Sequence, residues 1–227
     1  MSKLVWDRTG EKYYENGVNH GVLYVQSSDG TYPTGVVWNG LTTVSESPDG
    51  AEPNDIWADN IKYGSLRSAE TFGGTIEAYT YPDEWAACDG SASVADGVTI
   101  GQQSRSTFGL AYRTEIGSDT NPEAGYKLHL VYGATASPSE RSYETINDSP
   151  DAMTMSWEFD TIPVEVSTDD DEPNYKPTSL ITIDSTKTTS EKMKAIEAIL
   201  YGTDGAEGAQ GTTARLPLPA EVITLMS

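Results

Sequence analysis

Alternation of apolar and polar residues is the main signal along this chain, and it predicts strands with one apolar and one polar face. Four segments carry the alternation most clearly: residues 72–81, 107–116, 126–132 and 153–162. Two more strands are expected at residues 21–26 and 179–184. Because each of the four clear segments has a polar face, we expect antiparallel sheets with one side open to water.

A tight-turn dipeptide, Asn39-Gly40, stands between the strand-forming residues 36–38 and the extended residues 41–45. Asn-Gly is the strongest short hairpin signal, so the two segments are predicted to form a β-hairpin. A long acidic loop is expected from Ser45 to Asp59, because it begins with the turn residues Ser-Pro-Asp-Gly, and a strand should follow it. The composition of this loop suggests that it protrudes and touches another chain. Residues 91–103 and 134–150 are expected to be loops.

Two helices are predicted. The first covers residues 82–90, with Pro82 in its first turn and Gly90 at its end. The second covers residues 188–201, where Thr188 and Glu191 have the spacing of a capping box. A Gly-rich stretch and an apolar tail over residues 215–225 follow, which fits either a docking arm or a last strand packed on its own domain.

The length of 227 residues suits one domain with arms. We expect an N-terminal arm over residues 1–20 and a mainly β domain over residues 21–202 that includes the helix at 188–201. Residues 203–227 are expected to form a flexible linker and a C-terminal arm. The Tyr, Trp, Thr and Val content favours strands over helices.

Charge and cysteine content narrow the classes of function. The chain has 35 acidic against 14 basic residues, a formal net charge of −21. This surface does not favour nucleic-acid binding by counterion release, and an anionic membrane would repel it. Cys88 is the single cysteine, so neither an intrachain disulfide nor a Cys-based zinc site is expected. Without a signal peptide or a membrane-length apolar run, the protein is expected to be made in the cytosol, without membrane insertion.

No catalytic motif with a recognisable spacing is present, and we assign no catalytic, cofactor or metal residue. His129 alternates with Lys127 on a polar strand face, which indicates a surface histidine, and His20 is far from it in sequence. The run Asp169 to Glu172 fits a solvated loop better than a calcium site, because it lacks the spaced ligands of a calcium loop. Paired carboxylates for glycoside hydrolysis are expected by chance in so acidic a chain. The aromatic residues fit core positions better than a sugar-binding platform.

Several short sequence blocks keep their order from residue 4 to residue 225, and this order is more specific than any block alone. The blocks are Leu4-Val5-Trp6-Asp7, Gly21-Val22-Leu23-Tyr24, Val37-Trp38-Asn39-Gly40-Leu41, Glu46-Ser47-Pro48, Ala58-Asp59-Asn60-Ile61-Lys62-Tyr63, Thr75-Ile76-Glu77-Ala78-Tyr79-Thr80-Tyr81-Pro82-Asp83-Glu84, Lys192-Met193-Lys194-Ala195-Ile196-Glu197, Ile199-Leu200-Tyr201-Gly202 and Leu216-Pro217-Leu218-Pro219. Together they resemble the major tail proteins, or tail tube proteins, of long-tailed, siphovirus-type bacteriophages of Gram-positive hosts.

The resemblance implies an antiparallel β-sandwich or distorted barrel flanked by a helix, with extended loops and arms. It also implies hexameric rings of identical subunits, stacked into a tube in the tail of the virion after assembly in the host cytoplasm. The implied partners are other copies of the chain, the tail tip or initiator and tail terminator proteins, and the tape measure protein and DNA in the lumen without specific binding. The family has no catalytic residues to transfer.

Two hypotheses name residues. The acids on polar strand faces are expected to line the lumen, where like charge would keep DNA from adhering; they are Glu77, Glu115, Glu158 and Asp160. The alternative places those faces on the outer surface. The acidic loop is expected to contact a neighbouring subunit through Glu46, Pro48, Asp49, Glu52, Pro53, Asp55 and Trp57.

Other functions stay open. A carbohydrate-binding β-sandwich module is the main alternative, and a hydrolase is a weaker one. A tube from a contractile tail or a tailocin particle would also fit the resemblance.

Overall fold

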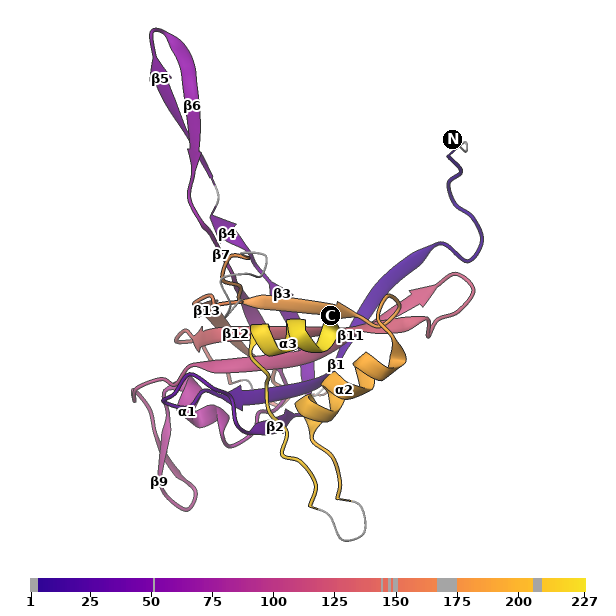
Figure 1. The fold of residues 1–227 in the computed structure, drawn as a ribbon. Coiled ribbons are helices and arrows are strands. Elements are labelled where there is room, and N and C mark those ends of the chain that lie inside the picture. Colours follow the sequence, from indigo (N-terminus) through magenta and orange to yellow (C-terminus); the bar gives the residue numbers. More distant parts are fainter. Residues whose placement is uncertain are drawn as a thin grey trace.

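The computed structural model describes residues 4–50, 52–143, 145–146, 148, 151–166, 175–205 and 210–227 (Figure 1). The described chain is mainly β, with one large antiparallel sheet, three two-stranded sheets and three helices. This confirms the predicted fold class. The acidic run Asp169 to Glu172, considered above for calcium, lies outside the described residues.

The large sheet has eight strands. They are β1 (Tyr13–Val25), β2 (Gly35–Trp38), β3 (Leu41–Glu46), β8 (Gly73–Ala78), β11 (Phe108–Ser118), β12 (Gly125–Ala136), β13 (Met155–Thr161) and β14 (Leu180–Asp184). The small sheets pair β4 (Asp49–Gly50) with β7 (Glu70–Thr71), β5 (Pro53–Ala58) with β6 (Ile61–Arg67), and β9 (Ala92–Ala95) with β10 (Val98–Ile100). The helices are α1 (Trp85–Asp89), α2 (Ser190–Tyr201) and α3 (Pro219–Met226).

The large sheet is closed on itself. Seven of its strands follow the order β2-β1-β11-β12-β13-β8-β3, and β14 pairs with the first part of β12. In a flat sheet the first and last of these strands would lie about 29 Å apart, since neighbouring strands are about 4.8 Å apart. Only Asn39 and Gly40 separate β2 from β3, and the chain from Trp38 to Leu41 spans at most about 11 Å. The sheet therefore curls until its two ends meet.

The turn at Asn39-Gly40 is present, but the predicted hairpin is wrong. β2 pairs with β1, and β3 pairs with β8, so the turn joins two edges instead of two paired strands. Gly40 has a φ of 76°, its carbonyl accepts a hydrogen bond from the Tyr79 amide at 2.9 Å, and the Trp38 indole donates to the Thr80 carbonyl at 2.9 Å. The turn signal was local, whereas the pairing was decided by the longer strands on either side.

The inside of the closed sheet is an aromatic core. Trp85, from α1, has its ring centroid 4.6 Å from that of Trp38, 4.9 Å from Phe108 and 5.5 Å from Trp157. These side chains come from a helix and three strands far apart in sequence, and all are buried. The alternation predicted for residues 72–81 and 153–162 is confirmed, because Ile76 and Trp157 face this core. The predicted helix end is confirmed as well: Gly90 caps α1 in the left-handed conformation.

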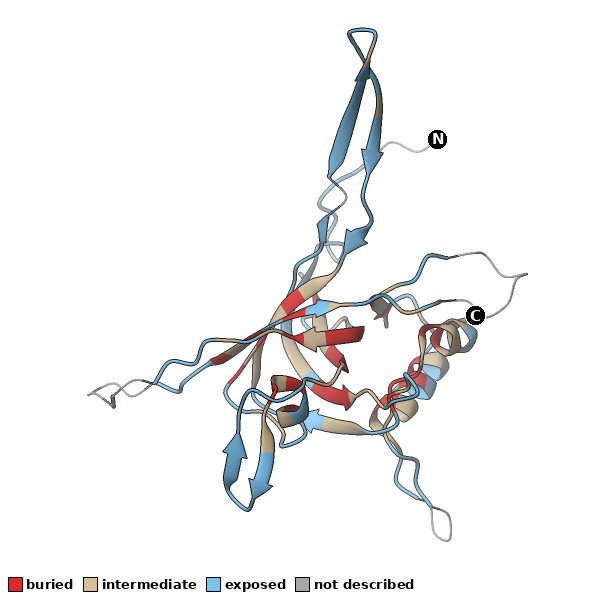
Figure 2. Ribbon diagram, turned by 90° about the vertical axis from the view of Figure 1, so that its left-hand side faces the viewer, coloured by how far each residue is buried: buried red, intermediate tan, exposed pale blue. Residues whose placement is uncertain are grey.

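A second core lies outside the sheet, under α2 and α3. Tyr24, Leu128 and Leu130 on the strands pack with Ile196 of α2 and Val222 of α3. β11 and β12 are therefore largely buried on both faces, and the expectation of one wet face is wrong for these strands. Figure 2 shows the buried segments concentrated in the curled sheet and on the helices, whereas the projecting hairpins are exposed.

The C-terminal tail folds back as a helix, with Pro219 in its first turn, instead of forming an arm or a strand. Its ion pair from Arg215 to Glu221, with nitrogen and oxygen 2.5 Å apart, ties the linker to the helix. At the other end, β1 already begins at Tyr13, so residues 13–20 belong to the sheet, and the N-terminal arm that projects from it is shorter than predicted (Figure 1). The cap of α2 is Thr189 instead of the predicted Thr188.

Two predicted loops contain strands. Residues 91–103 form the β9–β10 hairpin, and residues 45–59 hold the end of β3, β4 and all of β5. β12 also continues to Ala136, three residues into a third predicted loop. Most residues of the short strands β4, β5, β9 and β10 are exposed, so their sequences lack the apolar alternation of a strand that covers a core.

The crossing turn yields a stability prediction. A Cβ at Gly40 would lie 2.9 Å from Thr80 Cγ2, and its φ of 76° disfavours residues with a side chain. Gly40→Ala should therefore lower the free energy of unfolding by about 1–2 kcal/mol. Urea unfolding followed by tryptophan fluorescence measures this. Gly64→Ala is the control, because a Cβ there meets nothing within 4 Å, and it should unfold like the native chain. Equal stability of the two variants would contradict the prediction.

Candidate assembly surfaces

The β5–β6 hairpin projects far from the rest of the chain, beyond the small β4–β7 sheet (Figure 1). Its turn is Asp59-Asn60, and both residues have positive φ, 51° and 62°. That conformation fits the two-residue hairpin turns whose twist matches that of β-strands, and Asp and Asn adopt it more readily than most residues. An ion pair from Lys62 Nζ to Asp55 Oδ1, at 2.8 Å, links the two strands.

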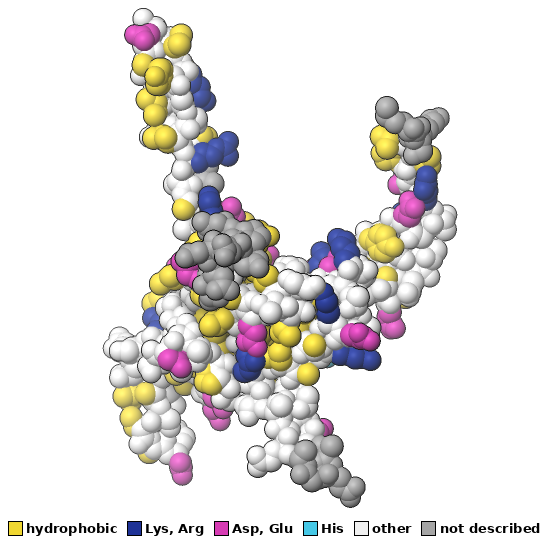
Figure 3. All heavy atoms as spheres, viewed as in Figure 1, with side chains coloured by type: hydrophobic (Ala, Val, Ile, Leu, Met, Phe, Trp, Pro, Cys, Tyr) yellow, Lys and Arg dark blue, Asp and Glu magenta, His cyan; other side chains and the backbone are white. Residues whose placement is uncertain are grey.

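Large apolar side chains on this hairpin are exposed to solvent. They are Ile56, Trp57, Ile61, Tyr63 and Leu66. Figure 3 shows hydrophobic side chains along one side of the hairpin and Lys and Arg side chains along the other. Contiguous exposed apolar surface on a soluble protein marks a surface for another molecule. Within the described chain, nothing packs on the outer side of this hairpin.

The residues predicted for subunit contact divide between the hairpin and its root. Pro53, Asp55 and Trp57 are on β5, and Glu52 lies just before it. Asp49 is on β4, and Pro48 precedes it. Glu46, the last residue of β3, points into the closed sheet, where it accepts a hydrogen bond from the Tyr112 hydroxyl. The sequence did not predict β5 as a strand, although the Asp59-Asn60 turn between Trp57 and Ile61 was a signal for a hairpin.

Three of the acids predicted for the lumen share one face. Glu77 on β8 lies opposite Ser156 of β13, and Glu158 and Asp160 follow at alternate positions of β13. This face of β8 and β13 points away from the aromatic core, and its strands alternate between buried and more exposed residues as predicted. It is a polar, acidic sheet surface.

The fourth acid, Glu115, lies elsewhere. It is on β11 and accepts hydrogen bonds from the Asn19 side chain at 2.7 Å and from Arg113 Nη2 at 3.1 Å. The Asn19 hydrogen bond lowers the pKa of Glu115 most, against the effect of burial, and Arg113 lowers it further. Its charge is thus balanced locally, unlike the acids on β8 and β13. The structure does not bring Glu115 together with them.

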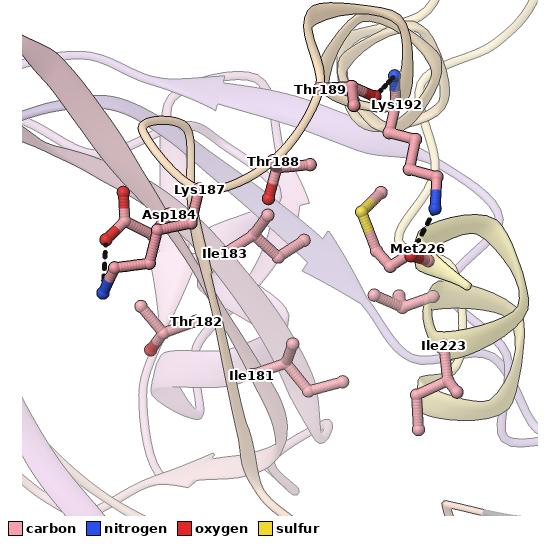
Figure 4. A pocket seen from close by; sticks show the side chains of 11 residues that line it. Ile181, Thr182, Ile183, Asp184, Lys187, Thr188, Thr189, Lys192, Ile223 and Met226 are labelled. Atoms are coloured by element: carbon pink, nitrogen blue, oxygen red, sulfur yellow. Dashed lines mark hydrogen bonds and ion pairs between the residues drawn. The ribbon is translucent and has the colours of Figure 1, made fainter.

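A partly open groove lies between β14, α2 and α3 (Figure 4), with a volume of about 360 Å³. Its floor is apolar, formed by Ile181 and Ile183 with Ile223 and Met226 from α3. The lysines at its rim are engaged: Lys187 pairs with Asp184 at 3.2 Å, and Lys192 Nζ donates to the Met226 carbonyl at 2.7 Å. The groove offers no nucleophile beside a base, and we assign it no chemistry.

Two further observations concern ligands and membranes. Within the described residues, no three His, Cys, Asp or Glu side chains are placed to hold a metal ion. No described helix has the length and apolar character to cross a membrane.

Of the five tryptophans, Trp38, Trp85 and Trp157 are buried in the core, while Trp6 and Trp57 are exposed on separate projecting elements.

Comparison with known proteins adds no relative: no protein-family model matches the chain, and no curated protein matches it significantly.

The exposure of Trp57 can be tested in solution. Its side chain is 66% exposed on the hairpin. Trp57→Phe should remove a large part of the fluorescence that acrylamide quenches, and should change the free energy of unfolding by less than about 0.5 kcal/mol. Quenching curves and urea unfolding measure both effects. Trp157→Phe, in the core, is the contrasting variant, since it should lower stability and leave the intensity of the quenchable fluorescence unchanged. A stability loss in Trp57→Phe equal to that of Trp157→Phe would contradict the placement of Trp57.

Proposed function

We propose that the chain is the structural subunit of a bacteriophage tail tube, which assembles into stacked hexameric rings that conduct DNA into the host. The order of the sequence blocks supports this function, as does the mainly β fold with a flanking helix. The observation that carries the proposal is the projecting β5–β6 hairpin, with its exposed apolar side chains. In this function, the hairpin reaches a neighbouring copy in the same ring or the next.

The energy of such a contact is substantial. Burying one large apolar side chain contributes about 1.5–3 kcal/mol, and the hairpin carries five that are exposed. An isolated two-stranded hairpin is only marginally stable in water, so packing against a neighbour also stabilises the hairpin itself. Association costs translational and rotational entropy. In a closed ring of six subunits the hairpin contacts form together, so their combined free energy offsets this cost.

The acidic face of β8 and β13 is the proposed lumen wall. Glu77, Glu158 and Asp160 would repel the DNA phosphates there, so that the duplex passes without adhering. The proposed partners are other copies of the chain, the tail tip or initiator and terminator proteins, and the tape measure protein, with DNA in the lumen. No catalytic role is proposed.

Carbohydrate binding is the function from another class. It would need aromatic rings that share a surface, and the two exposed tryptophans lie on different projecting elements (Figure 1). No observation favours it over assembly.

Removal of the hairpin tests the proposal. Replacement of residues 52–69 by a short Gly-Ser turn should leave a folded monomer that forms no tubes, because the hairpin adds nothing to either core. Negative-stain electron microscopy at increasing concentration, with circular dichroism for folding, measures this. Normal tubes from the shortened chain would overturn the proposal.

A single substitution makes the test more specific. Ile61→Ser should raise the critical concentration for assembly about tenfold or more, which corresponds to about 1.4 kcal/mol per subunit. Ile162→Ser is the matched control, because Ile162 is 74% exposed against 62% for Ile61 but lies off the hairpin. An equal rise of the critical concentration in the two variants would contradict the proposed assembly contact of the hairpin.

The lumen wall has its own test. A helical reconstruction of the tube by cryo-electron microscopy should place Glu77, Glu158 and Asp160 on the wall of the bore, because they lie on the uncovered acidic sheet face. A reconstruction that places this face on the outside of the tube would refute the lumen assignment while leaving the assembly proposal intact.

A further inference from the structure

A cluster of charged and polar side chains occupies one end of the closed sheet, and His129 stands at its centre. The sequence predicted a surface histidine, but this side chain on β12 is only 8% exposed, because the curled sheet brings β3 and β1 around it. Its ring stacks on that of Tyr112, with centroids 4.7 Å apart and planes 4° from parallel. Buried polar groups in folded proteins have hydrogen-bond partners, so the two ring nitrogens can be assigned from their neighbours.

The Nδ1 atom of His129 faces a carboxylate. It lies 3.0 Å from Glu46 Oε1, the same oxygen that accepts a hydrogen bond from the Tyr112 hydroxyl at 2.5 Å. The hydrogen bond from His129 is the largest cause that lowers the pKa of Glu46, against the effect of burial. An ionised carboxylate only accepts hydrogen bonds, so Nδ1 must carry a proton.

The Nε2 atom also faces acceptors. It lies 3.0 Å from the Thr114 hydroxyl oxygen and 3.6 Å from Glu15 Oε1. The Thr114 hydroxyl donates its single proton to Glu15 at 2.5 Å and can offer the imidazole only a lone pair. Burial disfavours the charge of Glu15, but hydrogen bonds from Lys127 and Thr114 outweigh it and lower the pKa of this carboxyl. Nε2 must therefore carry a proton too.

We propose that His129 is held as an imidazolium that bridges Glu46 and Glu15, and that it is a charge-dependent latch between two projecting elements. Glu46 is the last residue of β3, where the chain leaves the sheet for the β5–β6 hairpin. Glu15 is the third residue of β1, where the N-terminal arm enters the sheet. A neutral imidazole has one N–H and would turn a lone pair toward an acceptor on one side.

A protonated His129, together with Lys127, balances the charges of Glu15 and Glu46, whereas Asp184 has its own ion pair with Lys187 at 3.2 Å. The groups that face one another are Glu15 from β1, Glu46 from β3, Tyr112 and Thr114 from β11, Lys127 and His129 from β12, and Asp184 from β14, which acts on Lys127. With His129 charged, two cations meet the two bridged carboxylates. With His129 neutral, the two carboxylates share one ammonium, and their repulsion is no longer compensated.

The latch is expected to open at low pH. Since the pKa of Glu46 is lowered in the fold, its contribution is present above the ordinary carboxyl pKa and is lost as pH falls through the lowered value. The hairpin and arm roots then loosen together, although they come from different strands. This behaviour belongs to the single subunit and does not depend on tube assembly.

Nitrogen-15 NMR of the histidine rings of the full-length chain at pH 7 tests the protonation state directly. His129 should show two protonated nitrogens. His20 is the internal control: burial lowers its pKa, and it should show the pattern of a neutral ring. A single neutral tautomer at His129 would overturn the proposal.

Hydrogen exchange followed by mass spectrometry tests the latch. His129→Gln should speed amide exchange about tenfold at both residues 13–16 and residues 45–48 at pH 7, whereas His20→Gln should change neither segment. Glu46→Gln keeps the shape of the side chain and should also speed exchange at residues 13–16, on the far side of the histidine. Should His129→Gln fail to fold, Glu46→Gln decides: exchange must speed at residues 13–16 as well as at residues 45–48. Independent behaviour of the segments would refute the latch.

Discussion

The two-residue crossing from β2 to β3 is the constraint on which the rest of the structure depends. Asn39 and Gly40 join β2 and β3, the first and last strands of the sheet, and this short connection requires the sheet to close. Closure creates an inside, which the tryptophans and Phe108 fill, and it brings β3 close to β12. The contact of Glu46 with His129, 83 residues away in sequence, is a direct consequence.

Closure also produces two different outer faces. The face of β1, β11, β12 and β14 is apolar and is covered by α2 and α3. The face of β8 and β13 is polar and acidic. A single curled sheet thereby presents a helical layer on one side and a bare acidic surface on the other, and this difference underlies the proposed orientation of the subunit in a tube.

The sequence predicted the core-facing side of a strand better than it predicted the neighbouring strand in the sheet. Alternation in residues 72–81 and 153–162 reports the face that meets the core, and that face was identified. Pairing depends on distant strands, and the Asn-Gly turn carried no information about them. The apolar tail near residue 219 was recognised as apolar, but its helix depends on contact with α2 and the sheet. The role of Glu46 could not be predicted, because its partners become neighbours only when the sheet closes.

The direction of the hairpin restricts the kind of assembly that it supports. The hairpin points away from the sheet that carries it, so its apolar side cannot reach its own subunit (Figure 1). In the proposed tube, its partner surface would lie on a different part of another copy, which is a heterologous contact. Such contacts close into rings or continue as filaments, and a stacked tube combines both. Apolar exposure and direction both fit the proposed partner, a second copy of the chain.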